Sequence, residues 1–302
     1  MAVIASGAHP KALWPGIKAW WGRAYDEHQV EYTDLFDMDT SSQQYEEDVQ
    51  VTGFGLAPVK PEGGAVIYDS EVQGYVSRYL HVAYGFGYIV THEELRDTLY
   101  EVVSKRRSQA LAFSMRQTKE NVGANVYNRG FNSSFVFGDG VELISTAHPT
   151  LSGNQSNHLT TAADLSEASL EDMIIQIMGA TNDRGLKVSL MPRSLCVPRQ
   201  LWFEANRILK STLQNDTANN AVNVLKATNA LPGGIKVNHY FNDPDAWFVR
   251  TNAPRGQIGY TREAISFDQD NDFDTKNAKA KCYERYSFGS TNFRGVYGSP
   301  GA

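Results

Sequence analysis

The sequence predicts an α+β fold in which two long segments lack a hydrophobic core of their own. Apolar side chains recur at every second position from Val76 to Val90, broken only by Arg78, which predicts a strand of about 15 residues where roughly five or six are usual. The segment from His92 to Arg129 contains no proline and has a helical apolar pattern. It predicts a helix of about 38 residues and about 57 Å. Mixed helices and strands follow, and both long elements need other surfaces to pack on.

The composition is that of an ordinary folded protein without a membrane span. Hydrophobic residues make up 41% of the 302 residues and charged residues 21%, so extensive disorder is not expected. No apolar run approaches the roughly 18 to 20 residues of a membrane helix, and the N-terminus lacks a secretory signal pattern. Cys196 and Cys282 lie far apart and predict free, buried thiols in a reducing compartment. A net charge of −6 argues against a dedicated nucleic-acid-binding protein.

Residues 1–52 predict an arm that needs another surface. They hold too many aromatic residues for a solvated tail, but only WPGIKAWWGRAYDE, from Trp14 to Glu27, is typical of a short helix. Residues 24–59 contain nine carboxylates and no Lys or Arg, whereas the predicted long helix carries the basic triplet Lys105–Arg107. Opposite charges of this kind predict a contact within the chain or between copies; the alternative is that both segments are solvated.

Residues 53–90 predict an extended β excursion. GFGLAPVKPEGG, from Gly53 to Gly64, is punctuated by glycine and proline. We expect GGAVIYD, from Gly63 to Asp69, to pair with the long strand that ends at Val90. A two-stranded ribbon of this length is not stable alone in water, so it also requires a neighbour.

The predicted helix over residues 92–129 has signals at both ends. Thr91 and Glu94 form a capping box, and Gly130 occupies the position after the C-cap. The apolar stripe at helical spacing consists of Leu95, Leu99, Val103, Leu111, Met115, Thr118, Val122 and Val126. Because the stripe is interrupted at Arg107 and does not continue for four heptads, a coiled coil is disfavoured.

The rest of the chain predicts a compact α/β unit followed by returning β structure. FVFGDGVELIS, residues 135–145, predicts a hairpin that turns at Asp139 and Gly140. Helices are expected after Ser166, after Pro198 and over residues 218–229, and strands over 187–198, 235–241 and 246–251. Residues 257–288 predict antiparallel strands with the acidic turn DQDNDFDT between them.

No motif predicts catalysis. HEELR, His92–Arg96, differs from the zinc-protease pattern H-E-x-x-H because arginine replaces the second histidine, and it marks a helix start instead. DQDNDFDT departs from a calcium-binding loop at Phe273 and Lys279. His148 and His239 have no nucleophile motif beside them and are interpreted as structural. We therefore expect no enzyme activity, no cofactor and no metal site.

Several stretches along the chain resemble one protein family. They are EEDVQVTGFG to VKPEGG (Glu46–Gly64), SMRQTKENVGANV (Ser114–Val126), STAHP (Ser145–Pro149), DLSEASLE (Asp164–Glu171), FEANRILKSTLQNDTANNAVN (Phe203–Asn223), NDPDAWF (Asn242–Phe248) and ERYSFG (Glu284–Gly289). Together with the aromatic arm, the long ribbon and the long helix, they resemble the major capsid proteins of tailed bacteriophages. The resemblance runs through nearly the whole chain and implies the Hong Kong 97-type capsid fold.

The resemblance also implies a role for each segment. These are an N-terminal arm (1–52), an extended loop formed by a β-hairpin that reaches over a neighbouring subunit (53–90), a peripheral domain (91–165) with a spine helix (92–129), an axial domain at hexamer and pentamer centres (166–249), and returning strands of the peripheral domain (250–302).

The implied function is that of a structural major capsid protein, a virion component that self-assembles into the icosahedral head of a tailed bacteriophage. Its implied partners are other copies of the chain, a portal, a decoration protein and packaged double-stranded DNA on the inner face. Because the arm is short, a separate scaffolding protein is expected, with assembly in the host bacterial cytoplasm and no membrane. Two alternatives stay open: an encapsulin-type shell around protein cargo, and a soluble hydrolase that uses His148 or His239.

Contacts between subunits are expected at charged residues of the arm, the loop and the helix. They are Asp34, Asp37, Glu46, Glu47, Lys60, Glu62, Arg78, Lys105, Arg106 and Arg107. Some relatives cross-link a loop lysine to an asparagine, for which Lys60 is the nearest candidate here. The sequence identifies neither the partner nor an assisting acid, and we predict no cross-link.

Overall fold

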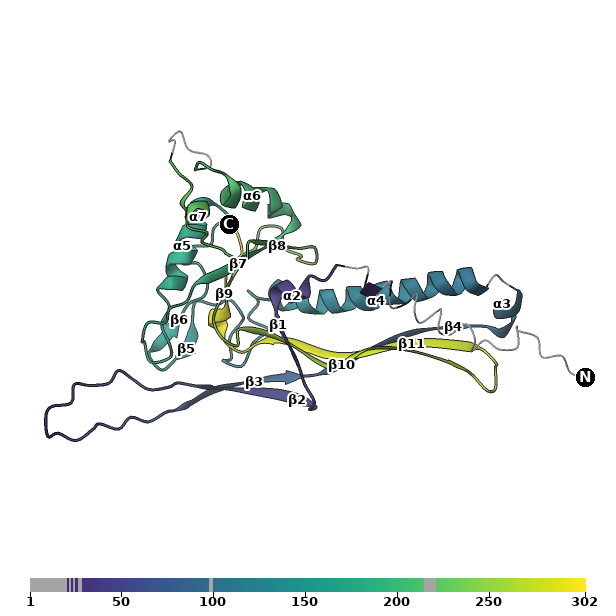
Figure 1. Ribbon diagram of the computed structural model, residues 1–302, viewed down its shortest axis with the longest axis horizontal. Coiled ribbons are helices and arrows are strands. Elements are labelled where there is room, and N and C mark those ends of the chain that lie inside the picture. The colour runs from purple at the N-terminus through teal and green to yellow at the C-terminus, as the bar shows by residue number, and fades with distance from the viewer. Residues whose placement is uncertain (1–20, 22, 24, 27–28, 98–99, 215–220) are drawn as a thin grey trace, which may run out of the picture.

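The fold is elongated, with a lobe of helices and strands standing over one part of a long β-sheet (Figure 1). A ribbon ending in an open loop projects at one end of the molecule, and the two longest strands turn back at the other. The computed structural model describes residues 21, 23, 25–26, 29–97, 100–214 and 221–302.

The long sheet has four strands in the order β1-β10-β11-β4. Their bounds are Asp37–Thr40 (β1), Val82–Val90 (β4), Gln257–Asn271 (β10) and Ala278–Ser290 (β11). β1 pairs parallel with β10, and the other pairs are antiparallel. The antiparallel structure predicted over residues 257–288 is therefore confirmed, with the acidic turn between β10 and β11.

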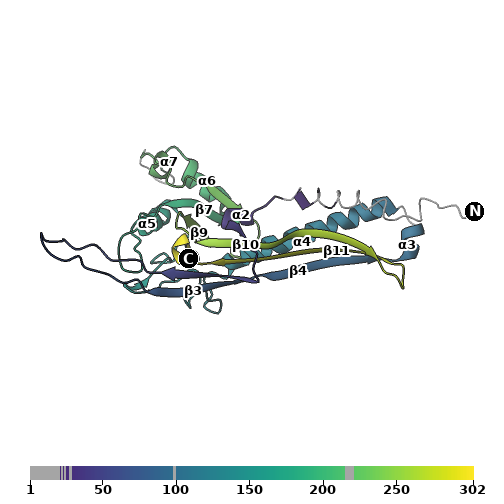
Figure 2. The ribbon, with the colours of Figure 1, turned by 60° about the horizontal axis from the view of Figure 1, so that its bottom comes forward.

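Two helices, α3 (His92–Asp97) and α4 (Tyr100–Asn128), replace the single helix predicted over residues 92–129. α3 lies at an angle to α4, and α4 runs along the long sheet in both views (Figures 1 and 2). The predicted cap at Thr91 is present in part, because the Glu94 amide donates to the Thr91 hydroxyl at 3.4 Å.

The buried face of α4 is turned by about one residue from the predicted apolar stripe. Leu111 and Met115 are buried as expected, whereas Thr118, Val122 and Val126 are only half-buried. The other buried positions are Ser108, Ala112, Arg116, Lys119, Glu120, Gly123, Ala124 and Tyr127. Charged side chains thus occupy part of the inner face, which the apolar pattern could not indicate. Of the predicted stripe, Leu99 and the side chains of Leu95 and Val103 lie outside the described residues.

A second sheet, in the order β12-β9-β7-β8, forms the base of the lobe. Its strands are Pro192–Pro198 (β7), Ile235–Asn238 (β8), Trp247–Thr251 (β9) and Val296–Ser299 (β12). The last strand, β12, pairs with β9 in this sheet, whereas β10 and β11, from the same predicted segment of returning strands (250–302), lie in the long sheet.

The helices of the lobe follow the predicted positions. They are Glu167–Met178 (α5), the 3-10 helix Arg199–Leu201 (η3), Trp202–Lys210 (α6) and Val224–Ala227 (α7). Ser166 caps α5, and Leu170, Met173 and Ile177 of α5 pack with Trp247 in the lobe's core. The third helix, predicted over 218–229, is shorter than expected among the described residues, and residues 218–220 lie outside them.

The ribbon consists of β2 (Tyr45–Val51) and β3 (Gln73–Leu80), paired antiparallel. This corrects two predictions: the long strand over 76–90 is divided at His81 between the ribbon and the long sheet, and its ribbon partner is YEEDVQV, not GGAVIYD. β3 turns its odd-numbered side chains inward, as at Ser77 and Tyr79, whereas β4 turns its even-numbered side chains inward, as at Val90. The buried parity therefore changes at the division, and the apolar Val76 and Leu80 are exposed. Residues 65–72 are exposed and form no strand.

The segment over residues 131–147 contains turns and no strands, so the hairpin predicted there is wrong. The turn at Asp139 and Gly140 is present, since the Phe137 amide donates to the Val141 carbonyl at 2.9 Å and Gly140 has a φ of +83°. A small hairpin follows, formed by His148–Thr150 (β5) and Gly153–Gln155 (β6).

Part of the arm packs on its own chain. The short helix α2 (Tyr32–Leu35) places Leu35 and Phe36 in a buried cluster with Tyr127 of α4 and Phe248 of β9. The helix predicted from Trp14 to Glu27 lies mostly outside the described residues. Both cysteines are free and buried, as predicted.

Candidate assembly surfaces

Residues 52–72 connect β2 to β3 and present apolar side chains to solvent. Leu56, Val59 and Tyr68 are 81%, 94% and 92% exposed. Gly53 and Gly63 have φ values of +65° and +75°, a left-handed conformation that favours glycine and interrupts strand pairing. A continuous exposed apolar segment of this kind marks an interaction surface.

The two sides of this loop enclose a hollow of about 600 Å³. At its base the Gly55 amide donates to Asp69 Oδ2 at 2.8 Å, and at its tip the Gly64 amide donates to the Pro61 carbonyl at 3.0 Å. The apolar lining residues are Phe54, Leu56, Ala57, Pro58, Val59, Pro61, Ala65, Val66, Ile67 and Tyr68. The hollow is therefore framed by the two sides of the loop, which hydrogen bonds hold at the base and the tip, and its lining is mostly apolar.

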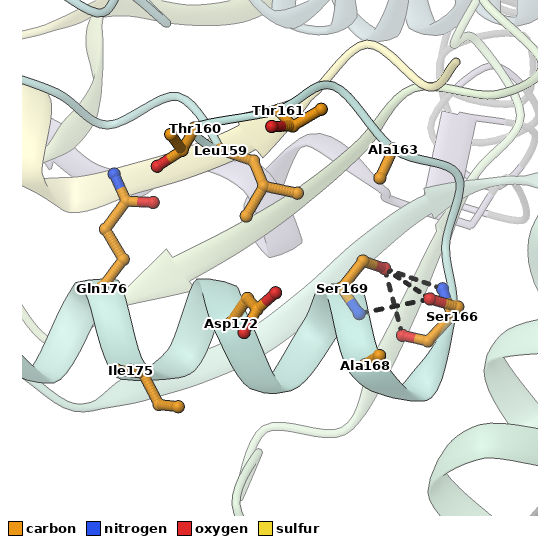
Figure 3. A pocket seen from close by; sticks show the side chains of 10 residues that line it. All are labelled: Leu159, Thr160, Thr161, Ala163, Ser166, Ala168, Ser169, Asp172, Ile175 and Gln176. Carbon is orange, nitrogen blue, oxygen red and sulfur yellow. Dashed lines mark hydrogen bonds between the residues drawn. The ribbon is translucent and has the colours of Figure 1, made fainter.

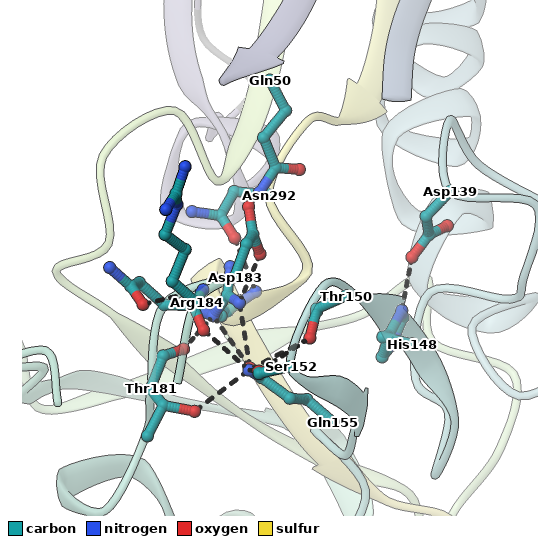
Figure 4. Close-up of polar contacts among 12 residues, drawn as sticks. Gln50, Asp139, His148, Thr150, Ser152, Gln155, Thr181, Asp183, Arg184 and Asn292 are labelled. Carbon is teal, nitrogen blue, oxygen red and sulfur yellow. Dashed lines mark hydrogen bonds and ion pairs between the residues drawn. The ribbon is translucent and has the colours of Figure 1, made fainter. Parts of the chain in front are cut away.

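Five residues, here called the loop brace, hold the root of the loop against the lobe, and Figure 4 labels Gln50, Asp183 and Arg184 among them. Asp183 accepts hydrogen bonds from Arg294 Nη2 at 2.7 Å and, through its other oxygen, from Gln50 Nε2 at 2.5 Å. The next residue, Arg184, pairs with Asp69 across 3.0 Å. The Asp183 and Arg294 side chains are 11% and 6% exposed. The turn that follows α5, which contains Asp183 and Arg184, therefore contacts the chain at both ends of the loop. One of its contacts is the buried ion pair with Arg294.

The ribbon has one packed face and one open face. On the packed face, Asp48 pairs with Arg255, and the rings of Tyr79 and Tyr260 meet edge to face with centroids 5.0 Å apart. The open face carries exposed side chains and the ion pair Glu47–Arg78 at 3.1 Å. Its exposed apolar residues are Tyr45, Val49, Val76 and Leu80. The open face adds apolar surface beside that of the loop.

The acidic arm contacts cations of its own chain. Asp34 pairs with Lys236 at 2.8 Å, and Asp37 pairs with Arg193 at 3.1 Å and with Arg250 at 3.2 Å. A contact within the chain was one of the predicted outcomes, but these cations belong to the lobe and not to the basic triplet.

The basic triplet has no described contact with the acidic arm. Arg107 pairs with Glu94 of α3, Arg106 is exposed, and the side chain of Lys105 lies outside the described residues. The contacts of the triplet with another subunit stay a prediction.

The other predicted contact residues lie on the ribbon and the loop. Glu46 accepts a hydrogen bond from Ser41 Oγ at 2.6 Å, and Glu47 and Arg78 pair with each other. Lys60 and Glu62 are exposed near the tip of the loop and have no ion pair with any described residue. Whether any of these residues touches another subunit stays a prediction.

A buried charge cluster fastens the arm and the long sheet to α4. Lys119 Nζ lies 3.3 Å from Glu284 Oε2, with side chains 7% and 1% exposed. Burial raises the pKa of Glu284, while the ammonium group of Lys119 acts to lower it. Glu120 accepts hydrogen bonds from the backbone amides of Glu31 and Tyr32 at 3.1 and 2.9 Å. The arm is therefore anchored through its backbone.

The two histidines of the hydrolase alternative have structural surroundings. His148 is buried and stacks on Phe293 at 4.1 Å, and its nitrogens bond to Asp139 Oδ2 at 2.5 Å and Asn157 Oδ1 at 2.9 Å. His239 Nδ1 lies 2.5 Å from a carboxylate oxygen of the arm. Among the described residues, neither imidazole bonds a serine, threonine or cysteine that could act as a nucleophile.

His81 joins the ribbon to the long sheet and was not singled out from the sequence. Its ring bonds to the hydroxyls of Ser287 at 2.9 Å and Ser41 at 3.0 Å, and it is 3% exposed. Burial lowers the pKa of His81 and so favours the neutral ring. No substrate could reach a ring that is buried in this way.

A second hollow, of about 510 Å³, lies beside α5 (Figure 3). Small and polar side chains line it, and Ser166 and Ser169 are occupied with each other in the helix cap. Gln176 donates to two backbone carbonyls. Asp172 is the one charged residue of the lining, so the hollow has no acid–base pair for catalysis.

Two searches of the described part of the chain bear on membranes and metals. None of its helices is long and apolar enough to cross a membrane. No group of three histidine, cysteine, aspartate or glutamate side chains within it could hold a metal ion.

The sequence matches the model of one protein family, described as phage capsid protein, over residues 75–299. A search of the curated proteins found no match. A structure from Mycobacterium phage Che8 is similar, with a TM-score of 0.54 and 13% identity over 91% of this chain and 93% of that one. The procapsid of bacteriophage JBD30 gives 0.52 and 13% over 98% and 76%. A virus-like particle from Pyrococcus furiosus gives 0.51 and 10% over 94% and 97%.

Proposed function

The chain belongs to the phage capsid protein family, and we propose that its copies close into the icosahedral head of a tailed bacteriophage around double-stranded DNA. It is a structural major capsid protein with the Hong Kong 97-type α+β fold. The family match does not favour the encapsulin-type alternative. Because the members of a capsid family are structural proteins, the match also supports a hydrolase less well than a capsid protein.

The exposed apolar loop over residues 52–72 is the observation that carries this proposal. Its side chains have no core within the chain, although the loop brace and the two loop turns hold its shape. Burying such a surface contributes about 25 cal/mol per Å² of apolar area. A neighbouring copy supplies the surface that a lone chain lacks.

The geometry of the contact explains how a closed shell can form. A loop that projects from one end of a subunit onto a different surface of the next makes a heterologous contact, and repeated heterologous contacts close when the rotation permits. Many such contacts per subunit stabilise a shell without any single one being strong.

In this proposal each part of the fold has a separate task. The ribbon and residues 52–72 act as the extended loop, the long sheet with α4 acts as the peripheral domain, and the lobe acts as the axial domain of hexamers and pentamers. A separate scaffolding protein, a portal, a decoration protein and packaged DNA complete the set of proposed partners, and assembly takes place in the host bacterial cytoplasm.

Light scattering and electron microscopy of the chain purified from bacterial cells test the proposal. We expect hollow megadalton particles of uniform size from the wild-type chain. Particles that contain a protein cargo and no nucleic acid after production in phage-infected cells would favour the encapsulin-type shell. A chain that remains a monomer or small oligomer in infected cells would contradict both.

A further inference from the structure

The tip of the β10–β11 hairpin carries a solvent-exposed aromatic side chain on a hydrogen-bonded turn. Phe273 is 96% exposed. Asp272 organises the turn: its amide donates to the Asn277 carbonyl at 2.9 Å, its carbonyl accepts from the Lys276 amide at 2.9 Å, and its carboxylate accepts from Lys279 Nζ at 2.7 Å. A large apolar side chain held out by an ordered turn loses little freedom when it binds, so it is preorganised for a receptor.

The chain also carries a receptor of suitable chemistry, the hollow enclosed by residues 54–69. It is mostly apolar and about 600 Å³ in volume, and a hollow of that size accommodates an aromatic ring with its neighbours. The hairpin tip and the loop lie at opposite ends of the molecule in both views (Figures 1 and 2). The two features therefore meet only between different copies of the chain.

The charges beside the two features are complementary. Asp274 and Lys276 flank Phe273, and Lys60 and Glu62 lie near the tip of the loop. None of these four side chains has an ion pair with a described residue. Complementary unpaired charges around an apolar contact fix its register and disfavour wrong pairings.

Another exposed aromatic group, Trp202 and Phe203 at the start of α6, fits the hollow less well. The two rings contact each other at a tilt of 53°, with centroids 4.8 Å apart, so neither stands alone as Phe273 does. The nearest charges, Glu204 and Arg207, already pair with each other at 3.0 Å.

We propose that Phe273 of one copy inserts into the hollow of residues 54–69 on a second copy, with Lys60 near Asp274 and Glu62 near Lys276. The inference rests on the proposed function, and it names the partner surface of the loop. The contact is heterologous, because each copy inserts its Phe273 into one neighbour and receives the Phe273 of another in its own hollow. The contacts can therefore continue from copy to copy.

Assembly of Phe273→Ala tests the proposal against the control Leu151→Ala, whose side chain is 61% exposed on the β5–β6 turn. A central aromatic anchor that is truncated weakens binding by about tenfold or more, so Phe273→Ala is expected to raise the concentration at which particles form by that factor. Its circular dichroism as a subunit stays that of the wild type, and Leu151→Ala assembles normally. If wild-type particles form and Phe273→Ala assembles equally well, this inference alone is overturned. If the wild-type chain forms no particles even in infected cells, the proposed function is overturned.

Charge exchange and directed cross-linking test the contact itself. Lys60→Glu and Asp274→Lys each weaken assembly, and the double variant restores it. Val59→Cys and Thr275→Cys chains, mixed before assembly, form disulfide-linked dimers in oxidising buffer, because the native thiols are buried. If the Val59→Cys chain cross-links instead to a chain with Glu204→Cys on α6, the hollow receives α6 and the proposal is wrong.

Discussion

Replacing Asp183 by alanine is expected to destabilise the subunit and loosen the extended loop together. The change leaves Arg294, whose side chain is 6% exposed, without its carboxylate partner, and it removes the acceptor of the Gln50 amide. Breaking a buried ion pair by removing one member costs about 3–5 kcal/mol because the remaining charge is desolvated and unpaired. That is a large part of a typical stability of about 5–15 kcal/mol.

Two measurements on the unassembled subunit separate the two effects. Urea denaturation gives the free energy of unfolding, and the rate of chymotrypsin cleavage within residues 52–72 reports how firmly the loop is held. Arg184→Ala removes the more exposed pair with Asp69, so we expect a loss of at most about 1 kcal/mol but faster cleavage.

Glu204→Ala is the matched control, because it breaks the exposed pair with Arg207 far from the loop. It is expected to change the free energy of unfolding by at most about 1 kcal/mol and to leave loop cleavage unchanged. The reasoning fails if Asp183→Ala costs no more than this control, or if its loop is cleaved at the wild-type rate.

Three further predictions concern a buried ion pair, a close backbone approach and the buried thiols. Lys119→Met leaves the Glu284 carboxylate buried and unpaired, and lowers the free energy of unfolding by about 3–5 kcal/mol near pH 7. Burial already raises the pKa of Glu284 above its ordinary 4.5, and loss of Lys119 raises it further. Urea titrations should therefore show the loss in free energy of unfolding shrinking as pH falls through the raised pKa. A loss that stays constant with pH contradicts this. Gly138→Ala places a Cβ against the Ser77 side chain and backbone and should cost about 1–3 kcal/mol, and thermal denaturation equal to wild type would refute the clash. Burial raises the pKa of Cys282 to about 12, so Ellman's reagent at pH 8 should label neither cysteine until the chain is denatured.

The ribbon shows what alternating patterns can and cannot predict. The period-two pattern from Val76 to Val90 correctly indicated strands, because alternation follows from local geometry. It did not indicate which face is buried, since Val76 and Leu80 are exposed in β3 whereas Val90 is buried in β4. It did not indicate that the chain changes sheets at His81, because pairing partners are chosen by distant residues. GGAVIYD had the β-branched composition of a partner strand, yet the charged YEEDVQV pairs instead, and its Asp48 meets Arg255 more than 200 residues away in the sequence.

Buried polar groups account for most of the rest. The inner face of α4 includes Lys119 and Glu120, which single-chain patterns assign to solvent because a charge is buried only when a partner is present. The loop brace joins Gln50, Asp183 and Arg294, which form no sequence motif. The apolar loop itself was identifiable, because its glycines, prolines and exposed β-branched residues are adjacent in the chain.

A cryo-electron microscopy reconstruction of assembled particles, at a resolution that traces the chain, tests the central claim most directly. The account predicts that residues 52–72 of every copy lie on a neighbouring copy, with Leu56, Val59 and Tyr68 buried between the two. Particles in which these side chains remain in solvent, or in which the loop packs on its own subunit, would contradict it.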